Sequence, residues 1–310
     1  MGWILLATAG QFLNAVVAIL DKYIVSDERL LPRPFVFAFY SCLITGFWIL
    51  IFLLGLVPGL AHLGAPSLAN IQAPTIQVAG MALLSAYAFF IALVSMYDAL
   101  QRSDAATVIP VIGSVAALAS FILSYVLLDT ALPSNFMYGI VLLAVGSALV
   151  AQTFPKRSIV MQVIHSGIFF ALHYITMKGL FEETNFDDGF FWSRVGLVIF
   201  AVSLLLVPMY WQKITDNTRH VTVRGGLIVV GSKVLAGVAS FLLLKATDWG
   251  EVAVVQALEA LKFVFIMVLT TLFVHWLPEA ATERELRPRE VWRRTLYVAV
   301  IAVGFLILFT

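Results

Sequence analysis

Charged side chains are scarce in this chain of 310 residues. Asp, Glu, Lys and Arg make up only 12% of the sequence, whereas 61% of the residues are hydrophobic. Because water-soluble domains carry about 25% charged residues, this composition excludes a soluble globule. The net charge of +1 offers no basic surface for nucleic acid. We therefore expect the chain to lie in a membrane, with lipid as its first partner.

Cysteine is nearly absent as well. Cys42 is the single cysteine, which excludes an intrachain disulfide and every metal motif built on several cysteines. The sequence also lacks the Gly-Lys phosphate loop, the H-E-x-x-H metal motif and the G-x-S-x-G nucleophile turn. We therefore expect no enzyme activity, no cofactor and no metal site.

Long apolar runs dominate what is present. A membrane-spanning helix needs roughly 20 mostly apolar residues. These runs are continuously apolar, whereas strands of a membrane barrel would alternate polar and apolar residues. The sequence thus predicts an all-α integral membrane protein with ten transmembrane helices. They are expected at residues 3–25, 34–57, 76–100, 105–128, 133–153, 159–181, 189–211, 225–246, 251–276 and 294–310.

The two halves of the chain, residues 1–154 and 155–310, resemble each other. Residues 105–129 align with residues 251–275 without a gap, which pairs Gly113 with Glu259. A second alignment pairs Lys22 with Lys178. Five helices in each half place the halves in opposite orientations, and such inverted repeats are frequent in secondary transporters. The predicted architecture is therefore an inverted repeat of five plus five helices, with a substrate site near the membrane midplane.

The distribution of Lys and Arg among the loops predicts the orientation. Most of these residues lie in the loops that follow the odd-numbered runs, and loops rich in Lys and Arg lie on the cytoplasmic side. Both termini are then expected outside the cytoplasm. The expected location is the inner, or cell, membrane of a bacterium or archaeon.

These features resemble the drug/metabolite transporter superfamily, in particular its ten-helix members built from two EamA-type halves. The resemblance covers nearly the whole chain, and it implies a solute carrier without machinery for nucleotide hydrolysis. The chain departs from the family pattern at Tyr40, where Arg is usual, and in the stretch EVAVVQALEALKF, where small residues and Pro are usual. Besides the runs and the repeat, the residues that carry the resemblance are Lys22, Lys178, Pro110, Asp129 and Arg194.

Three charged residues lie deep inside two of the apolar runs. A charge at the centre of the bilayer costs roughly 2.5–3.5 kcal/mol, so Lys233, Glu259 and Lys262 are expected to face partners or a polar cavity. Gln256 precedes Glu259 by three positions, which extends one polar arc along a helix. Two interpretations remain open: a closed salt-bridge cluster that joins two helices, and the wall of a binding cavity, which we favour.

Two lysines beside one glutamate favour a solute that carries a carboxylate or a phosphate. We hypothesise that Lys233 and Lys262 hold this anionic group. Glu259 would either hold an ammonium group or exchange a proton, because a desolvated carboxyl group has a raised pKa. Five other residues are candidates for the cavity wall. The alternative for each is helix packing, an interhelical hydrogen bond or extension to the interface. These residues are Asn14, Tyr87, His173, Tyr174 and Arg194.

Other polar residues have a simpler interpretation. Asp21, Lys22 and Lys178 lie near the ends of their runs and are interpreted as extending to the membrane interface. His165 and His173 are eight positions apart, whereas metal-binding pairs are usually three or four apart. Pro110 frees a backbone carbonyl and is a candidate for a bend used in gating.

The function that agrees best with these observations is secondary active transport. The chain would export or exchange a small polar metabolite, first an amino acid or another carboxylate, by alternating access. The substrate would be anionic or zwitterionic, with proton coupling through Glu259, and the carrier a monomer or a homodimer. One alternative is an antiporter of phosphorylated or nucleotide-linked sugars. Another is a membrane-embedded enzyme with a lipid substrate, or a structural membrane protein.

Overall fold

The computed structural model describes residues 2–27, 30–31, 33–57, 66–103, 105–128, 134–150, 157–219 and 221–272, with isolated positions between 296 and 307. Within these ranges every regular element is a helix. Six helices are long and apolar enough to cross a membrane. This confirms a multi-pass helical membrane protein. The six are α1 (Gly2–Ser26), α2 (Pro34–Gly46) continued by η1 (Phe47–Leu56), α3 (Ile76–Arg102), α4 (Ala105–Leu127), α6 (Arg157–Glu183) and α9 (Val223–Trp249).

Two predicted spans are not straight helices. Residues 189–211 fall in α7 (Phe186–Leu204) and α8 (Pro208–Thr218), which meet at a 96° bend. Pro208 opens α8 and Val207 before it is extended, because a proline disfavours the helical conformation in the preceding residue. Residues 251–276 fall in α10 (Val252–Ala257) and α11 (Ala260–Leu272), which are separated at Leu258 and Glu259.

The other elements are short or lie at the edge. The fifth predicted run forms α5 (Ser134–Val150), and η3 (Leu68–Asn70) is a single turn before α3. Almost all of the tenth run, residues 294–310, lies outside the described residues, as does Asp129.

Side-chain caps fix where several helices begin. Thr75 accepts a hydrogen bond from the Val78 amide before α3, at 3.2 Å. Thr222 does the same for the Gly225 amide at the start of α9, at 3.1 Å. These hydroxyls satisfy amides that have no acceptor inside the helix.

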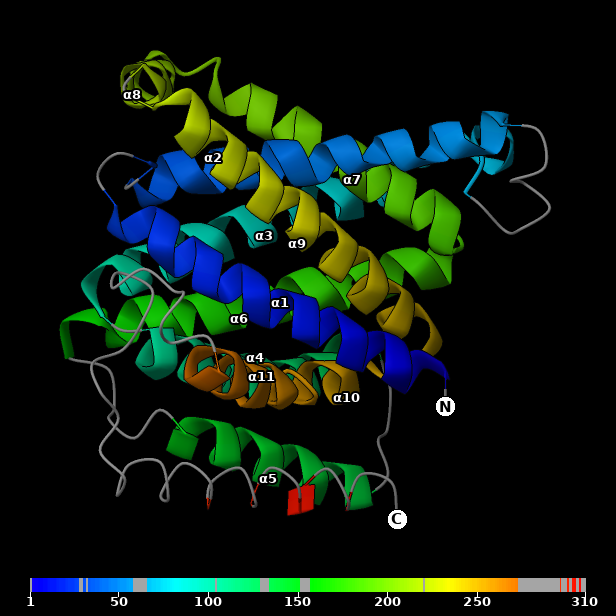
Figure 1. Ribbon diagram of the computed structural model, residues 1–310. Coiled ribbons are helices and arrows are strands. Elements are labelled where there is room, and N and C mark those ends of the chain that lie inside the picture. The colour runs from blue at the N-terminus through cyan, green and yellow to red at the C-terminus, as the bar shows by residue number, and fades with distance from the viewer. Residues whose placement is uncertain are drawn as a thin grey trace.

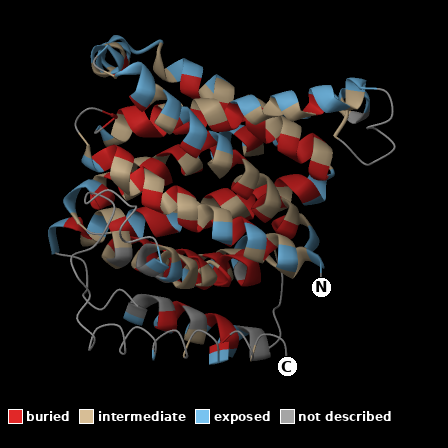
Figure 2. Cartoon of the chain, viewed as in Figure 1, coloured by how far each residue is buried: buried red, intermediate tan, exposed pale blue. Residues whose placement is uncertain are grey.

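The helices pack as crossed pairs around a shared centre (Figure 1). Helix α1 lies along α9, α3 lies along α6, and α4 packs on α6, while α5 covers the outside of α4. Buried residues gather on the faces that these helices turn toward one another, and exposed residues on the outer faces (Figure 2). Many large apolar side chains are exposed there, among them Leu5, Ile122 and Leu227. Such an outer surface suits contact with lipid.

Lys22 and Lys178 cap the ends of neighbouring helices. Lys22 Nζ donates to the Leu100 carbonyl at 2.8 Å, near the C-terminal end of α3. Lys178 Nζ donates to the Asp248 carbonyl at 3.1 Å, near the C-terminal end of α9. These carbonyls lie where a helix has no further amide to donate, and a cation is favourable there. Both lysines therefore have partners within the protein, at the ends of α3 and α9.

We expect Gly237→Ala to destabilise the protein. A Cβ atom at Gly237 would overlap the indole ring of Trp48, whereas a Cβ atom at Gly231 on the same helix meets nothing within 4 Å. Overpacking costs about 1–3 kcal/mol, but Gly231→Ala gains up to about 1 kcal/mol of helix propensity. Thermal unfolding in detergent should rank Gly231→Ala at or above the wild type and Gly237→Ala below it. Equal melting temperatures for the two variants would contradict this packing.

Candidate functional site

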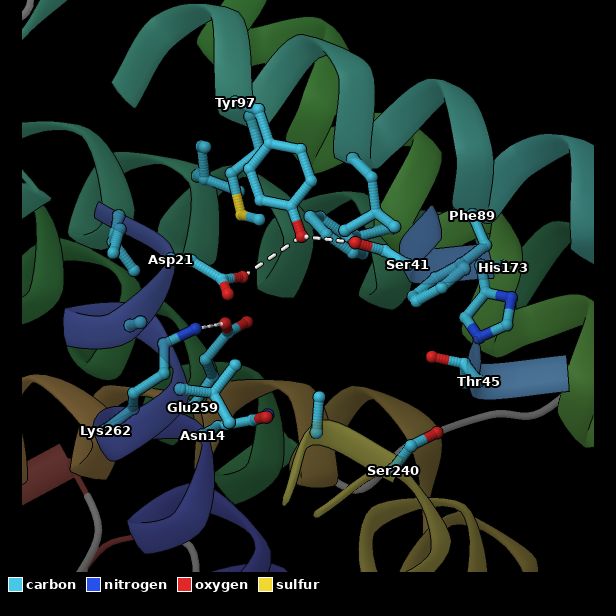
Figure 3. Close-up of a pocket in the computed structure, with 18 of the residues that line it drawn as sticks. Asn14, Asp21, Ser41, Thr45, Phe89, Tyr97, His173, Ser240, Glu259 and Lys262 are labelled. Atoms are coloured by element: carbon cyan, nitrogen blue, oxygen red, sulfur yellow. Dashed lines mark hydrogen bonds and ion pairs between the residues drawn. The ribbon is translucent and has the colours of Figure 1, made fainter. Parts of the chain in front are cut away.

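A cavity of about 120 Å³ with both polar and apolar walls lies between α1, α2, α3, α4, α6, α9 and the α10–α11 segment (Figure 3). Its apolar side comes mainly from α3, α4 and α6, with Phe89, Leu93, Ile112 and Phe170. Helices α1 and α9 and the α10–α11 segment supply most of its polar groups. Seven residues predicted from the sequence line this cavity, namely Asn14, His173, Tyr174, Lys233, Gln256, Glu259 and Lys262.

Glu259 and Lys262 form an ion pair at the break between α10 and α11. The Glu259 amide donates to the Gln256 carbonyl at 3.0 Å, and the Lys262 amide donates to the Glu259 carbonyl at 2.9 Å. These three-residue spacings tighten the chain locally, as in 3₁₀ turns, which often mark functional positions in a helix. The two side chains remain 17% and 10% exposed. Part of each charged group is therefore accessible from the cavity.

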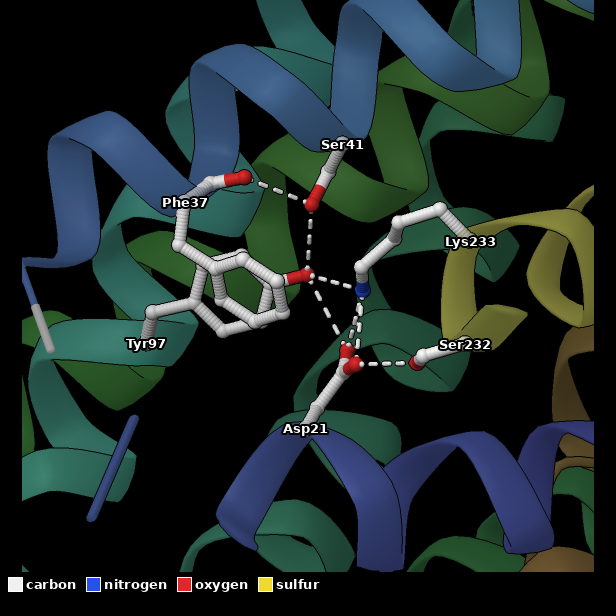
Figure 4. Close-up of polar contacts among 6 residues, drawn as sticks. All are labelled: Asp21, Phe37, Ser41, Tyr97, Ser232 and Lys233. Atoms are coloured by element: carbon white, nitrogen blue, oxygen red, sulfur yellow. Dashed lines mark hydrogen bonds and ion pairs between the residues drawn. The ribbon is translucent and has the colours of Figure 1, made fainter. Parts of the chain in front are cut away.

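Asp21 and Lys233 form a second, fully enclosed ion pair (Figure 4). Lys233 Nζ lies 2.6 Å and 2.8 Å from the two Asp21 oxygens and donates to Tyr97 Oη at 3.0 Å. Asp21 also accepts from Tyr97 Oη and from Ser232 Oγ, both at 3.0 Å. The side chains of Asp21 and Lys233 are only 5% and 2% exposed. All three ammonium donors of Lys233 can thus be occupied within this network.

The interpretation that Asp21 extends to the interface was wrong. Its partner Lys233 lies 212 positions away in the sequence, on α9, which packs along α1. This pairing changes the charge of the cavity. Its wall holds two carboxylates and two ammonium groups, so the cavity itself has no excess of positive charge. A zwitterionic ligand suits such a wall better than a simple anion.

The two histidines of α6 face α3 and are engaged between these helices. His173 Nδ1 lies 2.8 Å from Ser85 Oγ, and His165 Nδ1 lies 3.0 Å from Ser95 Oγ. His173 also packs its ring against Phe89, with 4.8 Å between ring centroids. Both contacts agree with the interhelical hydrogen bonds considered from the sequence.

Three other candidates do not line the cavity. Arg194 is buried on α7 beside it, and Tyr87 is 44% exposed at the outer surface, against Phe169 and Phe200. Pro110 lies inside α4, which continues to Leu127 as one helix. The break occurs instead in the aligned segment of the second half, at Glu259.

The sequence interpretation missed the function of Asp21 and did not find Tyr97. Asp21 shares a helical face with Gln11 and Asn14, and all three line the cavity, so the polar face of α1 was a usable signal. Tyr97 had no such signal, because a tyrosine near the end of an apolar run is typical of an interfacial residue.

The comparisons with known proteins concern the fold alone. No protein-family model and no curated protein matches the chain. One similar solved structure, titled only "Crystal structure of protein", has a TM-score of 0.61 at 16% identity. The match covers 99% of this chain and 98% of that one.

We expect Asp21→Asn to destabilise the protein severely, because it leaves the buried Lys233 ammonium without its counter-charge. Breaking a buried pair costs about 3–5 kcal/mol. The matched control is Asp98→Asn, which breaks the exposed Arg102–Asp98 pair at a cost of about 0–1 kcal/mol. The double variant Asp21→Asn, Lys233→Met should recover part of the loss. Thermal unfolding measures all three variants, and equal stability of the two single variants would disprove the importance of the enclosed pair.

Proposed function

We propose that the protein is a secondary transporter that moves a small zwitterionic metabolite by alternating access of the central cavity. The observation that carries this proposal is the accessible Glu259–Lys262 pair at a helix break, inside a multi-pass membrane protein. Broken helices with polar groups near the midplane are typical of transporter binding sites. Ionisable residues within membrane segments are retained mainly where they have a function.

The proposed architecture is the inverted repeat of ten helices, with halves at residues 1–154 and 155–310. Two correspondences support it. The aligned Lys22 and Lys178 cap the ends of α3 and α9, which hold the same place in the two halves. The packing of α1 along α9 also corresponds to that of α6 along α3. This arrangement agrees with the resemblance to the EamA-type members of the drug/metabolite transporter superfamily.

Glu259 and Lys262 are the proposed ligands of the solute. Among the described residues, Lys262 has one hydrogen-bond acceptor, the Glu259 carboxylate, although an ammonium group has three donors. A zwitterion can insert into this pair, with its ammonium group on Glu259 and its carboxylate on Lys262. Two ion pairs then replace one. Lys233 is occupied by Asp21, so we assign the anionic end of the solute to Lys262 alone.

The size of the cavity favours a very small solute. A cavity of about 150 Å³ holds one benzene molecule, so the volume of about 120 Å³ suits roughly six non-hydrogen atoms. The smallest amino acids have this size. Nucleotide-linked sugars, the alternative substrates considered from the sequence, are several times larger, and this conformation of the cavity does not favour them.

The Asp21–Lys233–Tyr97 network is proposed to close one end of the cavity. Asp21 precedes Lys22, and from the loop charges we expect this end to lie on the cytoplasmic side. In the aligned half the position of Asp21 is held by Met177, which is buried in an apolar cluster. We therefore propose that the ion pair of Asp21 closes one end of the cavity and that the apolar cluster around Met177 closes the other end. Opening the ionic end would release the solute to the cytoplasmic side or admit it from there.

We expect glycine, alanine or serine to raise the melting temperature of the purified protein. A ligand at 100 times its Kd stabilises by about 2.7 kcal/mol. Lys262→Met should abolish the shift, since it removes the partner of the carboxylate. Lys245→Met, which breaks a partly exposed pair outside the cavity, is the matched control. Phenylalanine, choline and a nucleotide sugar serve as larger or cationic comparisons. Stabilisation that survives Lys262→Met, or that only choline produces, would rule out this site.

Glu259 is also the proposed carrier of a coupling proton. In liposomes loaded with the stabilising solute, Glu259→Gln should slow transport by at least tenfold and remove its dependence on pH, because a glutamine cannot exchange a proton. The Lys245→Met variant should transport like the wild type. A Glu259→Gln variant with full rate and full pH dependence would exclude both roles of Glu259.

Cys42 provides a test of the gate. It is fully buried on α2, next to Ser41, whose hydroxyl lies 3.2 Å from Tyr97 Oη. Tyr97→Phe removes the hydroxyl that joins Ser41, Asp21 and Lys233 and leaves the ion pair intact. A hydrogen bond to a charged group contributes about 1.5–3 kcal/mol, so modification of Cys42 by a maleimide should become about tenfold faster or more. Tyr87→Phe, outside the cavity, should leave the rate unchanged, and an equal rate in Tyr97→Phe would refute the gate.

A further inference from the structure

Arg194 is a buried cation that has no counter-charge among the described residues. It is one of the largest fully buried side chains in the part of the chain that the structure describes, with 1% exposure. Its Nε donates weakly to Ser193 Oγ at 3.4 Å, and its guanidinium lies 4.5 Å from the centre of the Phe190 ring. Its Nη2 atom is buried and has no hydrogen-bond partner among the described residues. None of the five ion pairs within that part of the chain includes Arg194.

This arrangement is energetically costly. A guanidinium stays protonated in proteins, unlike a lysine, which can lose its proton when buried. An unpaired buried charge loses the hydration that water would supply, and the loss is large unless an ion of opposite sign replaces it. The cation–π contact with Phe190 offsets only part of this cost. Lys233, at similar burial, has Asp21 for this purpose. The position of Arg194 is therefore suited to an anion.

Arg194 lies behind one wall of the cavity. Its charge acts on His173 and Tyr174 of α6, and both residues line the cavity. Figure 3 shows His173 and Thr45 at the end of the cavity away from Asp21 and Lys262. Tyr174 interacts electrostatically with Glu259 as well as with Arg194. Tyr174 thus lies within electrostatic range of both the guanidinium and the cavity pair.

We propose that Arg194 binds a small monovalent anion behind the wall formed by His173 and Tyr174. The ligand is a halide or a small carboxylate, which accepts a hydrogen bond from the unpaired Nη2 group. A carboxylate suits the planar geometry of a guanidinium, and a halide suits a single donor with a full positive charge. Since this site is separate from the Glu259–Lys262 pair, it stands whether or not the cavity carries a zwitterion.

The test measures the stability of the purified protein against anions. The protein is kept at constant ionic strength in sodium gluconate, whose anion is far larger than chloride, nitrate or acetate. Chloride, nitrate or acetate then replaces gluconate stepwise. We expect a saturable rise of the melting temperature in the wild type and in Lys262→Met. In Arg194→Met the rise should vanish, and its melting temperature in gluconate should equal or exceed that of the wild type, because the uncompensated charge is gone.

Each result decides between sites. A rise that persists in Arg194→Met, or that Lys262→Met alone abolishes, would place the anion on the cavity pair and overturn the proposal, as would no rise with any anion. If chloride and acetate raise the melting temperature equally, the ligand of Arg194 is an anion from the solvent. If acetate alone raises it, the ligand is the carboxylate of a solute. If Arg194→Met fails to fold, Arg194→Lys is tested instead, because it keeps the charge but loses the planar set of guanidinium donors. It should weaken anion affinity at least tenfold, and unchanged affinity would equally overturn the proposal.

Discussion

The enclosed pair of Asp21 and Lys233 is the constraint on which the centre of this protein depends. Inside a membrane protein, no bulk water solvates a charge, so each charged group needs a partner or a polar cavity. Asp21 on α1 meets Lys233 on α9, and Tyr97 and Ser41 add α3 and α2 to the same network. Four helices from distant parts of the chain are thereby held at one point. The same four residues form part of the cavity wall.

The three buried lysine and arginine side chains of the described core differ mainly in how well their hydrogen bonds are satisfied. Lys233 has acceptors for all of its donors within one network. Lys262 has one acceptor and remains partly exposed to the cavity. Arg194 has a terminal nitrogen without an acceptor among the described residues. Lys233 therefore belongs to a structural pair, and Lys262 to a pair that can exchange partners. Arg194 is a cation that still needs an anion.

Much of the fold could be predicted because the membrane restricts it strongly. Six apolar runs became helices whose ends lie within a few residues of the predicted ones, since length and apolarity suffice to define a spanning helix. The bend before Pro208 and the break at Glu259 were missed. Both lie inside continuously apolar runs, where hydropathy is the same for a straight and a broken helix. Pro208 carried a signal for its bend, whereas nothing local marked Glu259 as the break.

By itself, the sequence determined that the chain lies in a membrane as helices and that Lys233, Glu259 and Lys262 face away from lipid. These conclusions follow from the cost of exposing charge to hydrocarbon, which needs no knowledge of neighbours. Only the tertiary structure decided that Asp21 is the partner of Lys233 and that the cavity is balanced in charge. Helical spacing tells which residues share a face. Which helix that face meets depends on how distant segments pack, and this the sequence pattern does not contain.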